Sequence, residues 1–275
     1  LQALGILGAG AAAGAINVVV GSGTLITFPI LLALGIPPVT ANVSNTLGLV
    51  PGSFSGAWSY RRELTGQRDR LVRLGGASVL GGIVGALLLL VLPAGVFTDV
   101  VPALIVLALG LVVAQPWLAR RLAGSEHRAG SEHGADSKHG ADSKHGADSE
   151  HGADAASPVL LWVLVLLTGI YGGYFGAANG VILIAILATL VAPRQADLQR
   201  MNALKNVLVG MLNGVAGVVF ILLAHPDWTY VAIIAVGATV GGQLGGFIGR
   251  RLSPMLLRAF IVVVGTAALI KFLLS

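Results

Sequence analysis

Residues 1–35 read LQALGILGAGAAAGAINVVVGSGTLITFPILLALG, an apolar run that is too long for one straight crossing of a membrane. A membrane-spanning helix needs about 20 mainly apolar residues. The run carries a glycine-rich break, Gly21-Ser22-Gly23, near its middle. Backbone groups cannot stay unpaired in lipid, so such a break must be covered by protein or line a wet cavity. The stretch predicts a membrane protein with a helix that is broken inside the bilayer.

The composition of the whole chain is that of a membrane protein. Hydrophobic residues make up 55% of the 275 residues, only 11% are charged, and the mean hydropathy is +0.87. A soluble domain needs more charge to cover its surface. Cysteine is absent, which excludes disulfides, thiolate metal sites and CxxC redox motifs. No basic residue precedes Leu1–Val20, so this segment does not resemble a signal peptide.

Apolar runs long enough to be membrane segments occur about eight times along the chain. They are Leu1–Gly35, Val39–Tyr60, Leu71–Leu92, Val96–Leu118, Val159–Ala192, Leu198–Ala224, Trp228–Gly249 and Pro254–Leu274. The fifth run is overlong like the first, and it carries a second break, Gly176-Ala177-Ala178-Asn179-Gly180. The sequence therefore predicts an all-α membrane protein of about eight segments, with broken helices or hairpins at segments one and five.

Matching spacings indicate that the two halves are repeats. Gly14 and Gly21 are spaced like Gly169 and Gly176. The spacing of Asn45, Gly52 and Gly56 equals that of Asn206, Asn213 and Gly217. The spacing of Gly81, Gly82 and Gly85 equals that of Gly241, Gly242 and Gly245. Three matches in the same order favour a duplication. We expect a first repeat over residues 1–120 and a second over residues 158–275, separated by a linker over residues 121–157.

The predicted linker contains a hydrophilic tract, Ser125–Asp154, made of the units SEHRAG, SEHGAD, SKHGAD, SKHGAD and SEHGAD. It has no large apolar residue, so we expect it to be disordered. Its histidines are able to chelate a metal, but a solvated linker that arose by repeat slippage is the preferred interpretation. We predict no metal site and no cofactor.

The basic residues predict how the repeats are oriented. They cluster in short breaks between runs, which is typical of cytoplasmic membrane loops rather than of nucleic-acid binding: Arg61, Arg62, Arg68, Arg70, Arg73, Arg120, Arg121, Arg194, Arg200, Arg250 and Arg251. If every run crossed once, the last four would lie outside the cell. If runs one and five are hairpins, all of these loops face the cytoplasm. The positive-inside rule therefore favours an inverted repeat in the plasma membrane with a cytoplasmic linker.

Lys205 is the residue that bears most directly on function. It lies about ten residues, or about 15 Å of helix, into the sixth run. A cation at that depth usually faces a protein interior or a water-filled path, which suits an anionic solute. The alternative is a lysine that reaches the membrane surface or bonds a neighbouring carbonyl group.

Polar side chains surround Lys205 in its own half and occupy the matching place in the other half. They are Asn202, Asn206, Ser44, Asn45 and Thr46. Amide and hydroxyl groups bind oxyanions without adding charge, so we predict that these residues bind substrate. Hydrogen bonding between packed membrane helices is the alternative role.

The two breaks are the other predicted part of the site. The segment Thr24–Gly35 and the segment that begins at Val181 resemble half-helices, whose N-terminal N–H groups and partial positive charge attract anions. Such ends meeting near the midplane would form a site on a pseudo-two-fold axis, lined by Ser22, Gly23, Thr24, Asn179 and Gly180. Close packing of small residues is the alternative.

The motifs of the two halves also run in a recognisable order. The first half has Ala13-Gly14, Gly21-Ser22-Gly23, Pro29, Ala41 and Asn45-Thr46, and the second has Gly169, Gly172-Gly173, Gly176-Ala177 and Lys205-Asn206. This order, which covers nearly the whole chain except the linker, resembles the TauE/SafE family of sulfite exporters. The chain departs from that pattern at Ser22, where members often have glycine, at Ala178 and Asn179, and in its long linker.

The resemblance implies a secondary carrier, a permease or exporter, of small sulfur-containing anions such as sulfite or organosulfonates. Its expected partners are the anion and the lipid bilayer, with no nucleic acid, and a homo-oligomer stays open. An anion channel or a membrane subunit of a larger complex is the alternative. An intramembrane enzyme is disfavoured because no histidine and no acidic pair lies inside a run.

Overall fold

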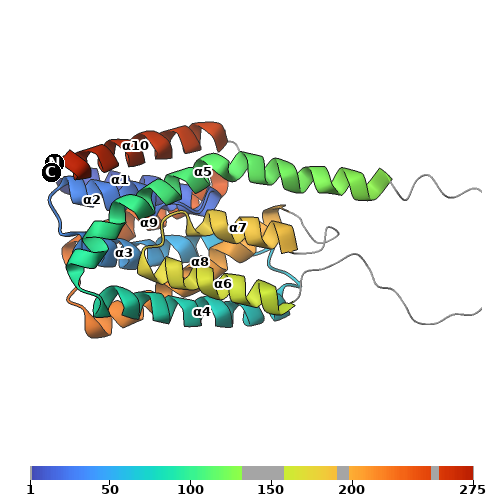
Figure 1. Ribbon diagram of the computed structural model, residues 1–275, viewed down its shortest axis with the longest axis horizontal. Coiled ribbons are helices and arrows are strands. Elements are labelled where there is room, and N and C mark those ends of the chain that lie inside the picture. The colour runs from blue at the N-terminus through green and yellow to red at the C-terminus, as the bar shows by residue number, and fades with distance from the viewer. Residues whose placement is uncertain (1, 132–157, 191–197, 249–253, 275) are drawn as a thin grey trace, which may run out of the picture.

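The computed structural model describes residues 2–131, 158–190, 198–248 and 254–274, and the regular structure of these residues is α-helical. The all-α expectation is thereby confirmed. Figure 1 shows the helices as one bundle, in the order α1 (Gln2–Val19), α2 (Thr24–Ala33), α3 (Pro38–Ser59), α4 (Arg68–Val91), α5 (Ala94–Ser131), α6 (Pro158–Tyr174), α7 (Asn179–Leu190), α8 (Leu198–Leu223), α9 (Trp228–Ile248) and α10 (Pro254–Leu274).

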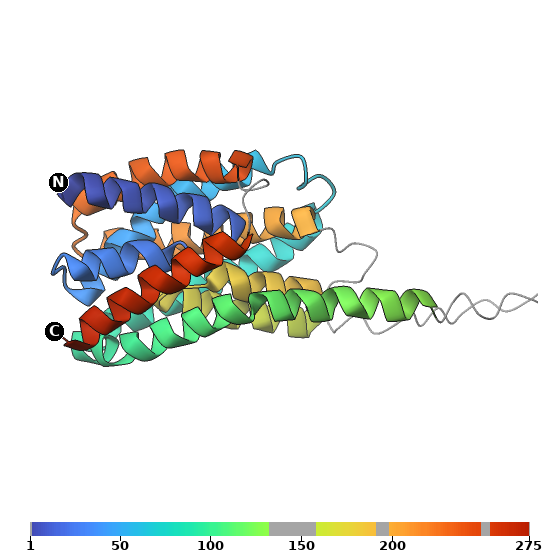
Figure 2. The ribbon, with the colours of Figure 1, turned by 90° about the horizontal axis from the view of Figure 1, so that it is seen from above.

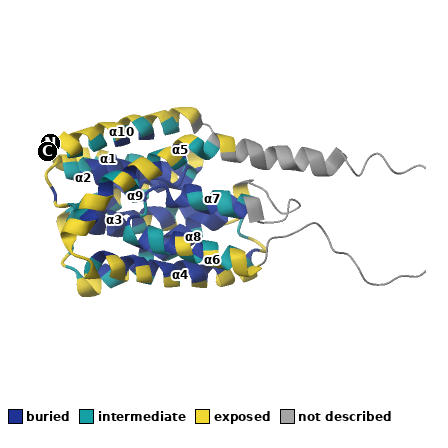
Figure 3. Cartoon of the chain, in the orientation of Figure 1, coloured by how far each residue is buried: buried dark blue, intermediate teal, exposed yellow. Residues whose placement is uncertain are grey.

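The outer surface of this bundle is apolar and therefore suits a lipid environment. Six stretches of the described helices are long and apolar enough to cross a membrane: Gln2–Val19, Arg68–Val91, Ala94–Gln115, Gln199–Leu223, Trp228–Phe247 and Met255–Leu274. Large apolar side chains such as Val91, Phe247 and Leu274 are more than three-quarters exposed. Figure 3 shows exposed positions on the outer helices and buried positions toward the centre. A soluble surface would hide side chains of this kind, so the bundle is that of a multi-pass membrane protein.

Both overlong runs are divided into two helices at the glycine-rich breaks. The first break lies between α1 and α2, and its Gly21 has a φ of 85°, a left-handed conformation that glycine adopts without strain. The second lies between α6 and α7, where Gly176 has a φ of 78° and Ala178 a φ of 57°. Helix α7 begins at Asn179, two residues before the expected Val181.

Each broken pair doubles back on itself. Helix α1 leads into the bundle from the end that holds both chain termini, and α2 returns toward that end (Figures 1 and 2). Helices α6 and α7 do the same from the opposite end, where the long C-terminal part of α5 projects beyond the bundle. The breaks are therefore carried into the bundle from its two ends.

Glycine-lined contacts interlock the predicted halves. Helix α1 packs against α9, and α6 packs against α4, in both cases with backbone on backbone. A Cβ on Gly10 would lie 2.9 Å from the carbonyl oxygen of Ile234, and one on Gly169 would lie 3.0 Å from the Cα of Gly81. Helices in lipid associate through close packing rather than through the hydrophobic effect, and small residues permit this close approach. The first helix of each broken pair, α1 or α6, thus packs against a helix of the other half.

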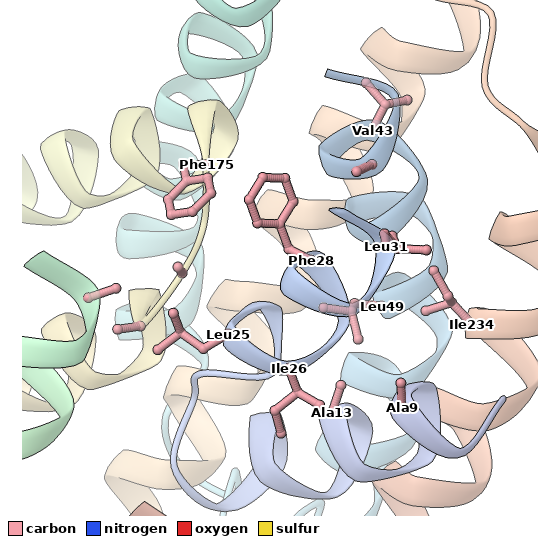
Figure 4. Close-up of a cluster of buried hydrophobic side chains, with 14 of the residues drawn as sticks. Ala9, Ala13, Leu25, Ile26, Phe28, Leu31, Val43, Leu49, Phe175 and Ile234 are labelled. Atoms are coloured by element: carbon pink, nitrogen blue, oxygen red, sulfur yellow. The ribbon is translucent and has the colours of Figure 1, made fainter. Parts of the chain in front are cut away.

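An aromatic cluster fills the core between α2, α5 and the second break. The ring of Phe28 meets that of Phe175 edge to face at 5.2 Å between centroids (Figure 4), and Phe97 lies 6.2 Å from Phe175 in a similar arrangement. All three side chains are buried. Edge-to-face pairs are a favourable geometry for aromatic rings, so the cluster supports the second break from the side of α2.

Helix α5 is longer than the sequence predicts. It continues beyond residue 120, the expected end of the first repeat, and ends at Ser131, so residues 121–131 of the predicted linker are helical. Leucine, arginine and alanine follow Trp117, and each added residue of a formed helix gains a backbone hydrogen bond at little nucleation cost. The remaining linker residues, 132–157, with four of its five histidines, lie outside the described part.

Gly10→Leu is expected to destabilise the protein, because the new side chain has to displace the backbone of α9. Overpacking of this kind costs about 1–3 kcal/mol. Gly8→Leu on the same helix is the control, since a Cβ there meets nothing within 4 Å. Thermal unfolding in detergent should show a lower midpoint for Gly10→Leu than for Gly8→Leu. Equal midpoints would contradict the close contact of α1 with α9.

Candidate functional site

The two glycine-rich breaks touch each other inside the bundle. The backbone N–H of Gly180 donates to the carbonyl oxygen of Gly21 at 3.0 Å, and a Cβ on Gly21 would lie 2.5 Å from the Cα of Gly180. Thr24 Oγ1 lies 4.0 Å from the Cβ position of Gly176. The N-terminus of each half-helix therefore lies against the break of the other half, and close packing holds these breaks together in this conformation.

Lys205 of α8 lies against Gly180 of the second break, and its side chain is fully buried, at 0% exposure. Its Nζ donates to the carbonyl oxygens of Val18 at 2.9 Å and Asn17 at 3.2 Å, and Asn206 Nδ2 donates to the same Val18 oxygen at 3.4 Å. These are among the last carbonyl groups of α1, which lack helical partners and carry the negative end of the helix dipole. In this conformation the lysine bonds neighbouring carbonyl groups, as its alternative interpretation anticipates.

A related contact caps the other broken helix. Asn42 Nδ2 of α3 donates to the carbonyl oxygen of Tyr174, the last residue of α6, at 2.9 Å. Each broken helix thus ends on a side chain from a crossing helix of the other half. Sequence reasoning did not single out Asn42, although an amide in an apolar run three residues before Asn45 was a signal for it.

The start of α2 is tied to α3 through Asn45. Asn45 Nδ2 donates to Thr24 Oγ1 at 3.1 Å, and Asn45 Oδ1 accepts a hydrogen bond from Thr27. The backbone at the N-terminus of α2 has no side-chain cap. Thr27 is a second residue that sequence reasoning missed. It follows Thr24 by one helical turn, and this spacing places both hydroxyl groups on the face toward α3.

Several buried polar atoms in the two breaks and on α3 and α8 have no hydrogen-bond partner within the described residues. They are Ser22 Oγ, Ser44 Oγ, Asn42 Oδ1, Asn202 Oδ1, and both amide atoms of Asn179. Buried polar atoms are nearly always paired, so a cluster of exceptions calls for an explanation such as an absent ligand or water. Four of these five residues were predicted as site residues, and the fifth, Asn42, caps α6.

The remaining predicted residues have packing contacts. Gly23 lies against α1, where a Cβ would be 2.5 Å from the carbonyl oxygen of Ala13, and Thr46 is buried on α3. Within the described residues, α1, α2, α3, α6 and α7 carry no acidic side chain, so Lys205 has no carboxylate partner on these helices. The described residues contain no group of three or more His, Asp or Glu side chains that could hold a metal ion.

Comparison with known proteins agrees with this architecture. The chain is 26% identical over 266 residues to the probable membrane transporter protein YfcA of Escherichia coli K12, a match that covers 95% of this chain and 86% of that relative. It is 25% identical over 265 residues to the probable membrane transporter protein ORF9 of a Sinorhizobium species, covering 95% and 88%. A probable membrane transporter protein of Haemophilus influenzae is 26% identical over 249 residues, covering 90% and 85%. No solved structure matches.

The family comparison covers nearly the whole chain. The family described as Sulfite exporter TauE/SafE matches residues 6–272, a range that includes both breaks, Lys205 and the crossing helices. Together with the transporter names of the relatives and the apolar helices, this match indicates a membrane transporter. The chain therefore belongs to the TauE/SafE sulfite exporter family of membrane transporters.

Proposed function

We propose that the protein is a secondary carrier of small anions, with sulfite or organosulfonate anions as its substrate class. The observation that carries this proposal is the meeting of the two breaks, each of which holds a buried polar side chain without a partner among the described residues, Ser22 in the first break and Asn179 in the second. Substrate binds there between the N-termini of α2 and α7, near the middle of the membrane. Carriers built from paired repeats commonly bind their substrates at such discontinuous helices.

The chemistry of the cluster favours an anion. Half-helix N-termini present backbone N–H groups and a partial positive charge, and Lys205 adds a basic group with no carboxylate beside it on the broken helices or on α3. The hydroxyl groups of Ser22 and Ser44 and the amide of Asn179 offer neutral donors without partners. Sulfite and sulfonate groups carry three oxygen acceptors on one centre, which suits a site that draws its donors from more than one helix.

The described conformation is closed around this position. The hydrogen bond from Gly180 to Gly21 and the full burial of Lys205 leave the breaks in contact. Substrate entry therefore requires the two breaks to separate, and this separation is the proposed opening step. Because α1 is packed on α9 and α6 on α4, movement of one broken pair moves helices of both halves.

We further propose that the halves form an inverted repeat of four segments each, with hairpins at the first and fifth segments. The broken pairs enter the bundle from opposite ends (Figures 1 and 2). The loop after α3 also meets the start of α8, since Arg200 Nη2 donates to the carbonyl oxygen of Thr65 at 2.8 Å. A parallel repeat would separate these two basic segments by the membrane, and the positive-inside rule favours placing both in the cytoplasm of a plasma-membrane protein.

Transport of an anion panel tests the proposed activity. In proteoliposomes, at least one of sulfite, sulfoacetate, thiosulfate and sulfate should show saturable counterflow of the labelled anion. Asn179→Ala should raise KM by about 10–100-fold, because a hydrogen bond to a charged group contributes about 1.5–3 kcal/mol. Gln243→Ala, which removes an exposed amide of α9, is the control. Single-channel currents or non-saturating flux would instead favour a channel.

Cysteine labelling tests the topology, and the chain has no native cysteine to interfere. Single-cysteine variants Arg62→Cys and Met255→Cys, both at exposed positions, should react with a membrane-impermeant maleimide only from the cytoplasmic face. Gly95→Cys, at an exposed position near the start of α5, should react only from the other face. Labelling of Arg62→Cys and Met255→Cys from opposite faces would refute the inverted arrangement.

A further inference from the structure

We propose that Lys205 carries one proton across the membrane together with each anion, so that the protein is a proton–anion cotransporter. This inference rests on the proposed function, because it assigns the coupling ion of the same site.

The hydrogen bonds of Lys205 match those of a neutral amine. Its Nζ has two acceptors, the carbonyl oxygens of Asn17 and Val18. A neutral amine has two N–H donors, and both are satisfied by these carbonyl groups. An ammonium has three donors, so its third N–H requires an acceptor that the described residues do not supply. An anion at the breaks is the acceptor that would complete the charged form.

Within the described residues, the helices that pack against α8 place no carboxylate beside Lys205, so an ammonium there has only the partial negative charge at the end of α1. Helices α1, α3, α4, α6 and α7 pack against α8. Within their described residues, α1, α3 and α7 carry no ionisable side chain, and α6 carries only Tyr171 and Tyr174. The charged groups of α4 lie at its N-terminal end, and Arg200 lies near the start of α8; these are Arg68, Asp69, Arg70, Arg73 and Arg200. An ion buried without a partner is costly, whereas an ion pair with hydrogen bonds is much less so.

The position of the lysine links its charge to the contact between the breaks. A Cβ on Gly180 would lie 3.0 Å from Lys205 Cδ, so the lysine chain runs directly over the glycine that donates to Gly21. The matching position in the other half is Ser44, which cannot carry a charge, so the site offers one proton-binding side chain rather than a symmetric pair.

The proposed cycle balances in protons and charge. On the loading side, the lone pair of Nζ takes a proton from water as the anion enters, and the third N–H of the ammonium donates to the anion. On the release side the anion leaves and the proton returns to water. The net movement is one anion with one proton, which is electroneutral for a monovalent anion, and the empty carrier reorients with a neutral lysine.

Accumulation in a pH gradient tests the coupling. The probes are labelled methanesulfonate and thiosulfate, anions of strong acids that do not cross lipid as neutral molecules. The membrane potential is held at zero with potassium and valinomycin, and the outside is one pH unit more acidic. A one-to-one coupling predicts about tenfold accumulation of substrate inside at equilibrium, because the proton ratio is tenfold, and a protonophore should abolish it.

Variants assign the proton to Lys205. Lys205→Met keeps a flexible, unbranched side chain, one atom shorter and without a basic group, and should reduce the accumulation ratio to one. Lys271→Met is the matched control: this lysine lies near the end of α10, where its Nζ donates to the carbonyl oxygen of Ala33, and tenfold accumulation should persist. Tenfold accumulation by Lys205→Met would overturn the proposal.

Proton uptake by the wild-type protein gives a test that does not depend on a folded variant. Methanesulfonate or thiosulfate added to the solubilised protein in weak buffer should cause uptake of about one proton per bound anion. Binding without proton uptake would overturn the inference. Saturable counterflow with an accumulation ratio of one would also overturn it, while leaving the anion carrier intact. Failure of every anion in the panel to move would instead contradict the carrier itself.

Discussion

The structure depends on one constraint, which is that backbone groups exposed by a broken helix must find partners inside a membrane protein. Helix α1 ends at Val19 and α6 ends at Tyr174, both within the bundle rather than at its surface. Their terminal carbonyl groups are met by Lys205, Asn206 and Asn42 from crossing helices of the opposite half. Without these side chains the breaks would leave unpaired carbonyl groups in a low-dielectric environment, at several kcal/mol each.

The same contacts explain why the halves are interlocked. A side chain of α8 that caps α1, and one of α3 that caps α6, require each half to reach across into the other. The glycine-lined contacts of α1 with α9 and of α6 with α4 meet that requirement, because α9 also packs on α3 and α4 on α8, so that each broken helix is held among helices of the other half. Stability and any movement of the breaks therefore depend on helices from both predicted halves, and neither half alone holds all of the candidate site residues.

Much of the candidate site could be anticipated from residue types and spacing. Ser22, Ser44, Asn179 and Asn202 were singled out as polar residues in apolar runs, and each has a buried atom without a partner. Asn42 and Thr27 were missed because their roles depend on which helix end lies opposite them, and no local pattern reports that. The sequence left two interpretations of Lys205 open, a side chain that binds an anion and one that bonds a neighbouring carbonyl group. The depth of a lysine in a membrane segment does not distinguish between them.

The sequence alone determined the membrane environment, the all-helical class, the two breaks and the family resemblance, because hydropathy, segment length and glycine placement are local properties of the chain. The tertiary structure alone decided that Gly21 and Gly180 meet and that Lys205 lies beneath them with carbonyl groups as its partners. These contacts join residues more than 150 positions apart. They arise from the crossing of helices from two halves, and the register of that crossing is set by packing across the whole bundle rather than by any single segment.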